Sequence, residues 1–435
     1  MRGMKTKLAR ILCVLLMGCS SSAEPADNDG DQADAADAFA GDLGADASSS
    51  GLVGDCDALD AASCAYKPAQ IYGSSGEIAR EFTYTDISGA ERTVRIEIRR
   101  PMGAPEPSPL IVWSHGGGAG RVNPATVGVG WGEVFTGAGF VSIAIAHEGR
   151  GATSASDLCF ALDLDECDLV SCTADADCLR VVVSSEETAP CVADPTLGGG
   201  YCRVMKDLSW DRPNDLREVL DWVESEASGG MLDGVVDVNR IAYGGHSAGS
   251  GSTMMVAGAA RRWRTNGEDS LLVDPRPVAF MSCSPQGPDD AGFTAASFTR
   301  ERCEALATPE QLPGCLTRPH LTLTGSGDGG DGVGGNRRLS FDLAPAGDRY
   351  LGYILENAPQ HTTFNYETEG CERYAQDNAL GSEYPARCTQ YLLWLRSAAL
   401  AFFDATLRDS SDAKAYLASG NLGALSGQVF EWTAK

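Results

Sequence analysis

Short apolar runs alternate with segments of helical periodicity from about residue 80 to residue 410. A run of four to eight apolar or β-branched residues between turn residues is typical of a strand, whereas apolar residues three and four apart predict a helix. We expect helices at 210–225, 248–261 and 390–407. We expect strands at 81–85, 94–99, 110–114, 140–146, 240–244, 278–282, 321–324 and 349–355.

This alternation predicts an α/β protein. Strands that alternate with helices form a mostly parallel sheet that helices cover on both faces. The first two strands are joined by a short segment that contains Ser88 and Gly89, so we expect an antiparallel hairpin at the start of the sheet.

The candidate nucleophile, Ser247, lies between a predicted strand and a predicted helix, in the sequence Gly-His-Ser-Ala-Gly at 245–249. In a G-x-S-x-G turn the glycines let the strand and the helix approach closely, and the serine hydroxyl projects at the carboxyl end of the sheet. The Ala248 N–H then lies at the helix N-terminus, where unpaired donors and the helix dipole favour an oxyanion. We therefore expect Ser247 to be a catalytic nucleophile and Ala248 to supply one oxyanion donor.

A second oxyanion donor is expected in the segment His-Gly-Gly-Gly at 115–118, which follows a predicted strand. A backbone N–H can approach a substrate carbonyl closely where no Cβ stands in the way. We choose Gly117 as this donor, with Gly118 as the alternative. We expect His115 to brace the segment, and the neighbouring Ser114 to be structural as well.

The general base can be chosen by elimination, because the chain has five histidines. His115 and His246 belong to the two motifs. His320 begins a strand, and His147 precedes the candidate nucleophile in the chain. Enzymes with this nucleophile turn place serine, acid and histidine in that order along the chain. His361, which follows the last predicted strand, is therefore the expected base.

The acid should follow the strand before the one that precedes this histidine. The strand at 321–324 runs into Gly-Ser-Gly-Asp-Gly-Gly-Asp. Asp328 is closer to the strand end than Asp331, so its carboxylate can be held rigidly against the histidine Nδ1. Asp331 is the alternative, and Asp289 and Asp290, after an earlier strand, are further candidates.

These motifs resemble those of the α/β-hydrolase family, and within it the bacterial dienelactone-hydrolase-like, chlorophyllase-like and platelet-activating-factor-acetylhydrolase-like serine esterases. The resemblance implies the α/β-hydrolase fold. It also implies that Ser247, His361 and Asp328 cleave carboxylic esters through an acyl-enzyme, without a metal or another cofactor. The segments that carry it are SHGGG at 114–118, DRPNDLREVLDW at 211–222, GHSAG at 245–249, SPQGP at 284–288, NAPQHTTF at 357–364 and LAFFDATL at 400–407.

Two other functions stay open on the sequence alone. The same triad could serve a peptidase or amidase, and a chain that keeps this fold could be a non-catalytic surface binding protein. Dienelactone hydrolases proper use a cysteine where this chain has Ser247, so their substrate is not expected here. We expect a small-molecule or lipid ester as substrate, and a monomeric enzyme.

The N-terminus predicts export to the cell envelope. Residues 1–18 combine four basic residues with a short apolar run, as signal peptides do. The following cysteine, Cys19, completes a segment that resembles the lipobox of bacterial lipoproteins, which implies a lipid anchor there, and Ser20 implies the outer membrane. Residues 19–54, rich in Asp, Ala, Gly and Ser, predict a disordered tether. The protein is therefore expected to be anchored to the outer membrane or secreted.

The charge balance argues against nucleic acid as a partner. The chain has 60 acidic and 34 basic residues, a net charge of −26, whereas phosphate backbones need clustered Lys and Arg. Residues 20–60 contain eleven of the acidic residues and no basic one. Eight of these eleven lie in the tether, so part of the acidity is local to it, and the net charge does not identify a substrate.

Fifteen cysteines indicate an oxidising compartment. Six of them lie in a polar insertion at 155–205, within a hydrolase domain at 55–435, and six cysteines allow fifteen pairings, which stay open. The insertion has no Cys-x₂-Cys pair, so zinc is not expected. Cys283 is the expected free thiol. The disulfides predicted from proximity are Cys56–Cys64, Cys303–Cys315 and Cys371–Cys388.

Overall fold

A computed structural model describes residues 64–435, apart from 77, 86–90, 117–128, 148–166, 172, 175–190, 195–198, 206–207, 263–268, 289, 291, 330–332, 357–360, 367–370, 372–374 and 376–380. At 167–171, 191–194, 199–205 and 208–211 it describes the backbone only. The chain divides into two units, 1–49 and 50–435, and every described residue belongs to the second. The predicted signal peptide, Cys19, the tether and the hairpin turn at Ser88 and Gly89 lie outside the described residues.

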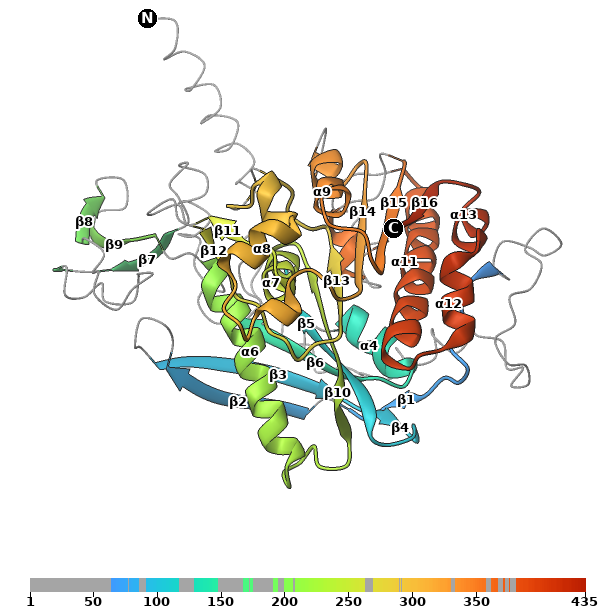
Figure 1. Ribbon diagram of the computed structural model, residues 1–435, viewed down its shortest axis with the longest axis horizontal. Coiled ribbons are helices and arrows are strands. Elements are labelled where there is room, and N and C mark those ends of the chain that lie inside the picture. Colours follow the sequence, from blue (N-terminus) through green and yellow to red (C-terminus); the bar gives the residue numbers. More distant parts are fainter. Residues whose placement is uncertain are drawn as a thin grey trace, which may run out of the picture. The chain divides into compact units, whose positions relative to one another are not determined.

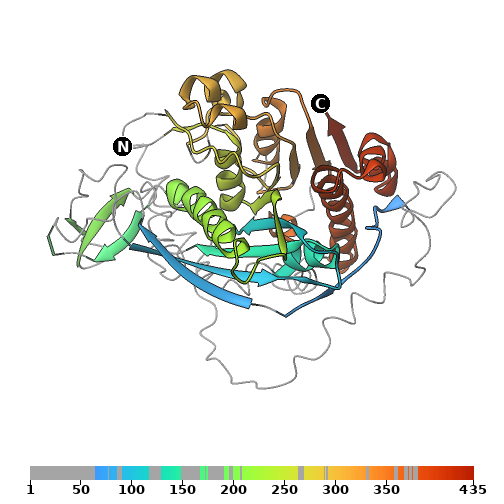
Figure 2. The same ribbon diagram turned by 60° about the horizontal axis from the view of Figure 1, so that its bottom comes forward.

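A nine-stranded mixed sheet forms the centre of the second unit (Figure 1). Its six middle strands are parallel neighbours, and antiparallel strands flank them on both sides. The antiparallel pair at the start of the chain is the long blue pair in Figure 2. In spatial order the strands are β16 (Phe430–Ala434), β15 (Arg349–Ile354), β14 (His320–Gly325), β13 (Ala279–Cys283), β10 (Val236–His246), β5 (Ser108–Ser114), β6 (Val141–His147), β3 (Glu91–Arg99) and β2 (Ile78–Thr85).

Helices cover both faces of this sheet, which makes the fold α/β. The helices are α4 (Val129–Gly137), α6 (Leu208–Ala227), α7 (Ala248–Ala257), α8 (Arg300–Leu306), α9 (Val333–Asp342), α11 (Tyr384–Leu407), α12 (Ser411–Ala418) and α13 (Asn421–Leu425). Short 3₁₀ turns η4 (Ala295–Phe298), η5 (Leu312–Gly314) and η6 (His361–Asn365) and the two-residue strands β1 (Gly73–Ser74), β4 (Pro101–Met102), β11 (Arg261–Arg262) and β12 (Asp269–Ser270) complete this part.

The alternation of side chains along β5 divides the core into two layers. Ile111 and Trp113 pack into one apolar cluster with residues of α4 and α11. Leu110 and Val112 point to the opposite face and pack with residues of α6 and α7. Because successive side chains of a strand point to opposite faces, an all-apolar strand such as β5 must be covered on both sides.

The structure contains the expected strands and helices with shifted ends, and it adds the helices α4, α8, α9, α12 and α13, which were not expected. The helix expected at 248–261 ends at Ala257, because Gly258 has a φ of 116° and caps it in the left-handed conformation. The helix expected at 390–407 begins at Tyr384 instead. β16 was not expected, and it pairs antiparallel with β15.

The backbone of the cysteine-rich insertion forms a small antiparallel sheet, with β9 (Gly199–Met205) between β7 (Cys167–Ser171) and β8 (Cys191–Asp194). The pairing of its cysteines lies outside the described side chains. Elsewhere the structure contains the two predicted disulfides Cys303–Cys315 and Cys371–Cys388, and Cys283 is a buried free thiol, as expected. Cys64 is disulfide-bonded, and its predicted partner Cys56 lies outside the described residues.

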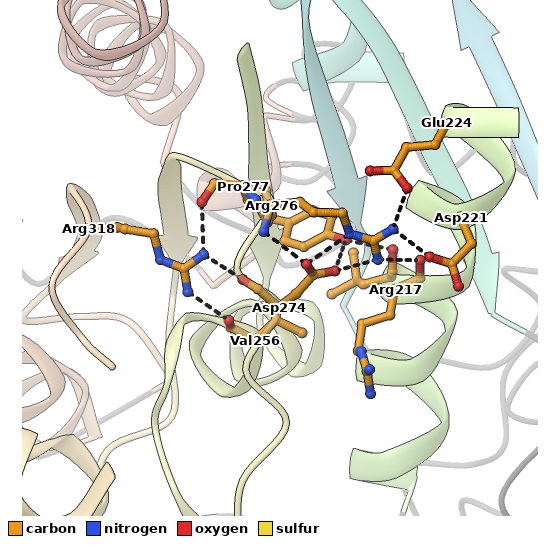
Figure 3. Close-up of polar contacts among 10 residues, drawn as sticks. Arg217, Asp221, Glu224, Val256, Asp274, Arg276, Pro277 and Arg318 are labelled. Carbon is orange, nitrogen blue, oxygen red and sulfur yellow. Dashed lines mark hydrogen bonds and ion pairs between the residues drawn. The ribbon is translucent and has the colours of Figure 1, made fainter. Parts of the chain in front are cut away.

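Charged side chains bind the amino ends of the central strands to α6 (Figure 3). Arg276, just before β13, forms ion pairs with Asp274, Asp221 and Glu224, the last two from α6. Arg318, just before β14, donates to the backbone carbonyls of Asp274 and Pro277. This edge of the sheet is therefore held by side-chain and backbone contacts.

Among the described residues, no helix combines the length and apolarity that crossing a membrane requires.

Candidate active site

Ser247 occupies a strained turn between β10 and α7. Its φ of 52° and ψ of −118° are rare for a residue with a Cβ, and such a conformation costs about 1–3 kcal/mol. The turn is held by hydrogen bonds from the Ser247 N–H to the Cys283 carbonyl (2.9 Å) and from the Gly251 N–H to the Ser247 carbonyl (3.1 Å). Ser247 itself is only partly buried. The surrounding structure therefore holds a serine at the surface in a backbone conformation that serine does not prefer.

The two glycines of the motif are needed for close packing around this turn. A Cβ on Gly245 would lie 2.4 Å from the Gly249 carbonyl, so strand and helix could not meet with a larger residue. A Cβ on Gly249 would lie 2.0 Å from the backbone oxygen of Ser114 at the end of β5. The G-x-S-x-G spacing thus brings the start of α7 against the end of β5.

The expected oxyanion donors lie on the two segments that meet here. Ala248 is the first residue of α7 and is partly buried. Gly116 lies next to the serine, because a Cβ on Gly116 would be 3.3 Å from the Ser247 Cβ and 2.7 Å from the His246 Nδ1. Gly117 and its alternative Gly118 lie outside the described residues.

His361 and Asp328 form a hydrogen-bonded pair at the carboxyl ends of the neighbouring strands β15 and β14. The His361 Nδ1 lies 2.7 Å from the Asp328 Oδ1. The Asp328 carboxylate is fully buried, whereas the His361 side chain is 31 % exposed. Thr324 donates to the second oxygen, Oδ2, at 2.7 Å, and the Arg337 Nε lies 3.4 Å from Oδ1. The carboxylate is thus fixed on several sides with the histidine between it and solvent.

The surroundings of Asp328 favour its ionised form. Burial alone would raise the pKa of this carboxyl group, but the hydrogen bond with His361 and the charge of Arg337 outweigh burial and lower the pKa below its usual 3.8. Of the other candidate acids, Asp290 is exposed, and Asp289 and Asp331 lie outside the described residues. Asp328 is therefore the described candidate that the fold brings to His361.

His246 connects the serine turn to the loop that carries His361. Its Nε2 lies 2.9 Å from the backbone oxygen of His361, and the centroids of the two rings are 4.6 Å apart. His246 immediately precedes Ser247, so these contacts place His361 beside the serine turn. This contact of His246 could not be predicted from the sequence, because it depends on a loop 115 residues further along the chain. We refer to Ser247, His361 and Asp328 as the outer set.

A second serine, histidine and aspartate lie together inside the protein. The Ser114 Oγ is 2.8 Å from the His147 Nε2, and the His147 Nδ1 is 2.7 Å from the Asp215 Oδ2. All three residues are buried. Arg92 donates to both Asp215 oxygens, at 2.7 and 2.8 Å. We refer to Ser114, His147 and Asp215 as the buried set.

The protonation of the buried set is fixed by its surroundings. Burial lowers the pKa of His147 to about 4, which keeps the ring neutral at pH 7. Burial alone would raise the pKa of Asp215, but the charge of Arg92 and its hydrogen bonds lower it well below the usual range. A neutral His147 therefore donates from Nδ1 to Asp215 and accepts the Ser114 hydroxyl at Nε2.

The buried set agrees with a structural role for Ser114, whose hydroxyl cannot reach solvent. His115, also expected to be structural, is buried, and its Nε2 accepts from the His147 N–H at 3.4 Å. The sequence reasoning missed Arg92 and Asp215. The available signal was that Asp215 lies on the apolar face of a predicted helix, where a charge is costly unless it is paired.

Among the described residues, no group of three or more His, Cys, Asp or Glu side chains is arranged to hold a metal ion.

Comparisons with known proteins leave the family open. No family model matches the chain, and no curated protein matches it. Among solved structures, the chain is similar to a ferulic acid esterase from Streptomyces cinnamoneus, with 18 % sequence identity and a TM-score of 0.46. That similarity covers 79 % of this chain and 93 % of the esterase.

Proposed function

We propose that this protein is a serine hydrolase of the α/β-hydrolase fold that cleaves carboxylic esters. The observation that carries the proposal is the outer set: a partly exposed serine in a strained strand-to-helix turn, beside a histidine that is hydrogen-bonded to a buried, ionised aspartate. Ser247, Asp328 and His361 follow β10, β14 and β15 in the chain order that such hydrolases use.

In the proposed reaction, Ser247 Oγ attacks the ester carbonyl carbon while His361 Nε2 takes the hydroxyl proton. Asp328 holds the proton on His361 Nδ1, so that Nε2 is free to accept, and stabilises the positive charge that the ring then carries. The N–H groups of Ala248 and Gly117 are proposed to donate to the oxyanion. The N-terminal end of α7 adds a favourable dipole at this point.

The second half of the reaction uses the same groups in reverse. The C–O bond to the alcohol breaks as His361 Nε2 returns its proton to the leaving oxygen, and the acyl group stays on Ser247. Water then gives a proton to His361 and attacks the acyl carbonyl. His361 then returns this proton to Ser247 Oγ as the acyl–oxygen bond breaks, which releases the carboxylic acid and restores the free Ser247 hydroxyl.

A fluorophosphonate probe with a fluorescent tag tests the nucleophile directly, because it labels only an activated serine. We expect labelling of the wild-type protein and none of Ser247→Ala. Ser252→Ala is the matched control, since Ser252 lies on the same helix and its hydroxyl donates to the Ala248 carbonyl at 3.2 Å. Labelling of Ser247→Ala, or none of the wild type, would overturn the proposal and favour a non-catalytic binding protein.

The substrate class is tested by comparing p-nitrophenyl esters of increasing acyl length with peptide anilides of matched P1 residue. The proposal expects ester turnover to exceed anilide turnover. Faster cleavage of the anilides would assign the site to a peptidase or amidase instead.

We also propose that the mature protein is anchored to the outer membrane through a lipid on Cys19, as the N-terminal sequence predicts. Metabolic labelling with an alkyne-tagged fatty acid should mark the full chain and not Cys19→Ala. Recovery of the wild-type chain in the soluble fraction without label would contradict the anchor and leave a secreted protein.

A further inference from the structure

Arg212 is a buried arginine that binds backbone oxygens instead of solvent. It lies on α6 and is only 2 % exposed. Its Nη1 donates to the His115 carbonyl, and its Nη2 donates to the Gly116 carbonyl at 3.4 Å. One guanidinium group therefore contacts two successive carbonyls of the chain that leaves β5.

This segment is the part of the chain that lies against the serine. A Cβ on Gly116 would be 3.3 Å from the Ser247 Cβ, so the backbone of Gly116 borders the nucleophile directly. The His115 Nδ1 also lies 2.5 Å from the Gly116 carbonyl oxygen. The Gly116 carbonyl is thus contacted by a ring nitrogen and by a charged group, and the His115 carbonyl by the charged group.

Holding the carbonyls fixes the direction of the amide groups that follow them. A peptide unit is planar and trans, so its N–H points opposite to its C=O. Arg212 therefore holds the peptide unit that carries the Gly116 N–H, next to the serine, without touching the reacting atoms. The planar guanidinium can bind two acceptors in a fixed geometry, whereas a lysine offers a single ammonium on a flexible stem.

Burying a guanidinium group has a cost that an apolar side chain at the same place would avoid. The Arg212 contacts adjoin the buried set: the His147 N–H donates to the His115 Nε2 at 3.4 Å, and Asp215 lies three residues after Arg212 on α6. The segment that borders Ser247 is thus in contact with buried polar groups from α6 and β6.

We propose that Arg212 is a positioning residue for the ester hydrolysis: by binding the carbonyls of His115 and Gly116, it orients the backbone N–H groups that receive the oxyanion at Ser247. This inference rests on the proposed function, and it concerns the transition state rather than substrate binding. Displacement of catalytic groups by about 1 Å can cost 10²-fold in rate, and loss of one oxyanion donor costs about 10²–10³-fold.

The test compares Arg212→Gln and Arg212→Lys with Arg217→Gln, a matched control on the same helix. For Arg212→Gln we expect kcat for a p-nitrophenyl ester to fall by about 10–10²-fold with little change in KM. Affinity for a trifluoromethyl ketone, which forms a tetrahedral adduct with serine, should fall by a similar factor. The kcat and the inhibitor affinity of Arg212→Lys should lie between those of the wild type and those of Arg212→Gln. Both quantities should be unchanged in Arg217→Gln. The fraction of protein labelled by the fluorophosphonate at completion should be the same in all of them, because the nucleophile is intact.

Folding is followed by circular dichroism and thermal melting. A folded Arg212→Gln with wild-type kcat would overturn the inference, and so would a rise in KM at unchanged kcat. If Arg212→Gln does not fold, Arg212→Lys decides: a reduced kcat with unchanged KM supports the role, and a wild-type kcat overturns it. Turnover by Ser247→Ala equal to that of the wild type would sink the proposed function itself. Loss of turnover only in Ser247→Ala would sink the Arg212 role alone.

Discussion

The outer set and the buried set contain the same three residue types in opposite surroundings. In both, a histidine Nδ1 lies 2.7 Å from an aspartate oxygen. The outer histidine is 31 % exposed, and its serine lies in a strained turn at the surface. In the buried set the serine and histidine have no access to solvent, and Arg92 neutralises the aspartate. The histidine–aspartate contact alone therefore does not distinguish the two sets, which differ in access to solvent and in the backbone geometry of the serine.

The largest expected difference lies between the two serines. Ser247→Ala should lower kcat for a p-nitrophenyl ester by roughly 10⁶-fold, because it removes the nucleophile. Ser114→Ala should leave kcat close to wild type and destabilise the fold by about 1–3 kcal/mol, because the buried His147 Nε2 loses its donor. Steady-state kinetics and urea denaturation measure the two effects. A folded but inactive Ser114→Ala would show that the two sets had been assigned the wrong roles.

The outer aspartate should affect the rate more than the fold. Asp328→Asn should lower kcat by about 10⁴-fold, because an amide favours the histidine tautomer with its proton on the wrong nitrogen. The expected loss is measured on protein whose melting curve shows it to be folded. A decrease of less than tenfold would mean that Asp328 does not orient His361 during the reaction.

The buried aspartate should do the reverse. Asp215→Asn removes the carboxylate of a buried ion pair with Arg92, and breaking such a pair typically costs about 3–5 kcal/mol. Urea denaturation should show this loss, whereas turnover per folded molecule should change much less than in Asp328→Asn. Retained stability would indicate that water or another carboxylate replaces the ion pair.

The smallest expected effect is an acid-dependent loss of stability from the buried histidine. Burial holds the pKa of His147 at about 4 in the folded protein, below the usual 6.5. Between pH 6.5 and pH 4 the unfolded chain binds a proton that the folded chain does not. The free energy of unfolding therefore falls as the pH falls through this window, by up to about 1.4 kcal/mol per pH unit.

His147→Asn should remove this share of the slope in urea denaturation measured from pH 7 to pH 4. Part of the slope should remain, because burial lowers the pKa of His320 as well, to about 3. A slope identical to that of the wild type would show that His147 does not contribute in this way.

Two members of the outer set carry a local signal in the sequence. Ser247 lies in a motif whose glycines predict a tight turn, and Asp328 follows a short apolar strand. His361 was reached by elimination among five histidines, which a chain with more of them would not have allowed. What the sequence could not supply was the contact between His246 and the His361 loop, which forms only when distant strands align.

The buried set and its partner Arg92 could not be predicted together, since these residues come from four separate elements. Arg92 lies on β3, Ser114 on β5, His147 on β6 and Asp215 on α6. No periodicity pairs residues across such distances along the chain. Only Asp215 could be noticed in the sequence, because it is a charged residue beside the buried Leu216 on the apolar face of its helix.

The strand β16 has a consequence for how the sheet is completed. β15, which leads to His361, is an inner strand only because residues 430–434 pair with it. Before those residues pair, β15 is an open sheet edge, and such edges pair with other chains. Loss of residues 430–434 would therefore expose an unpaired sheet edge next to the proposed base and favour aggregation.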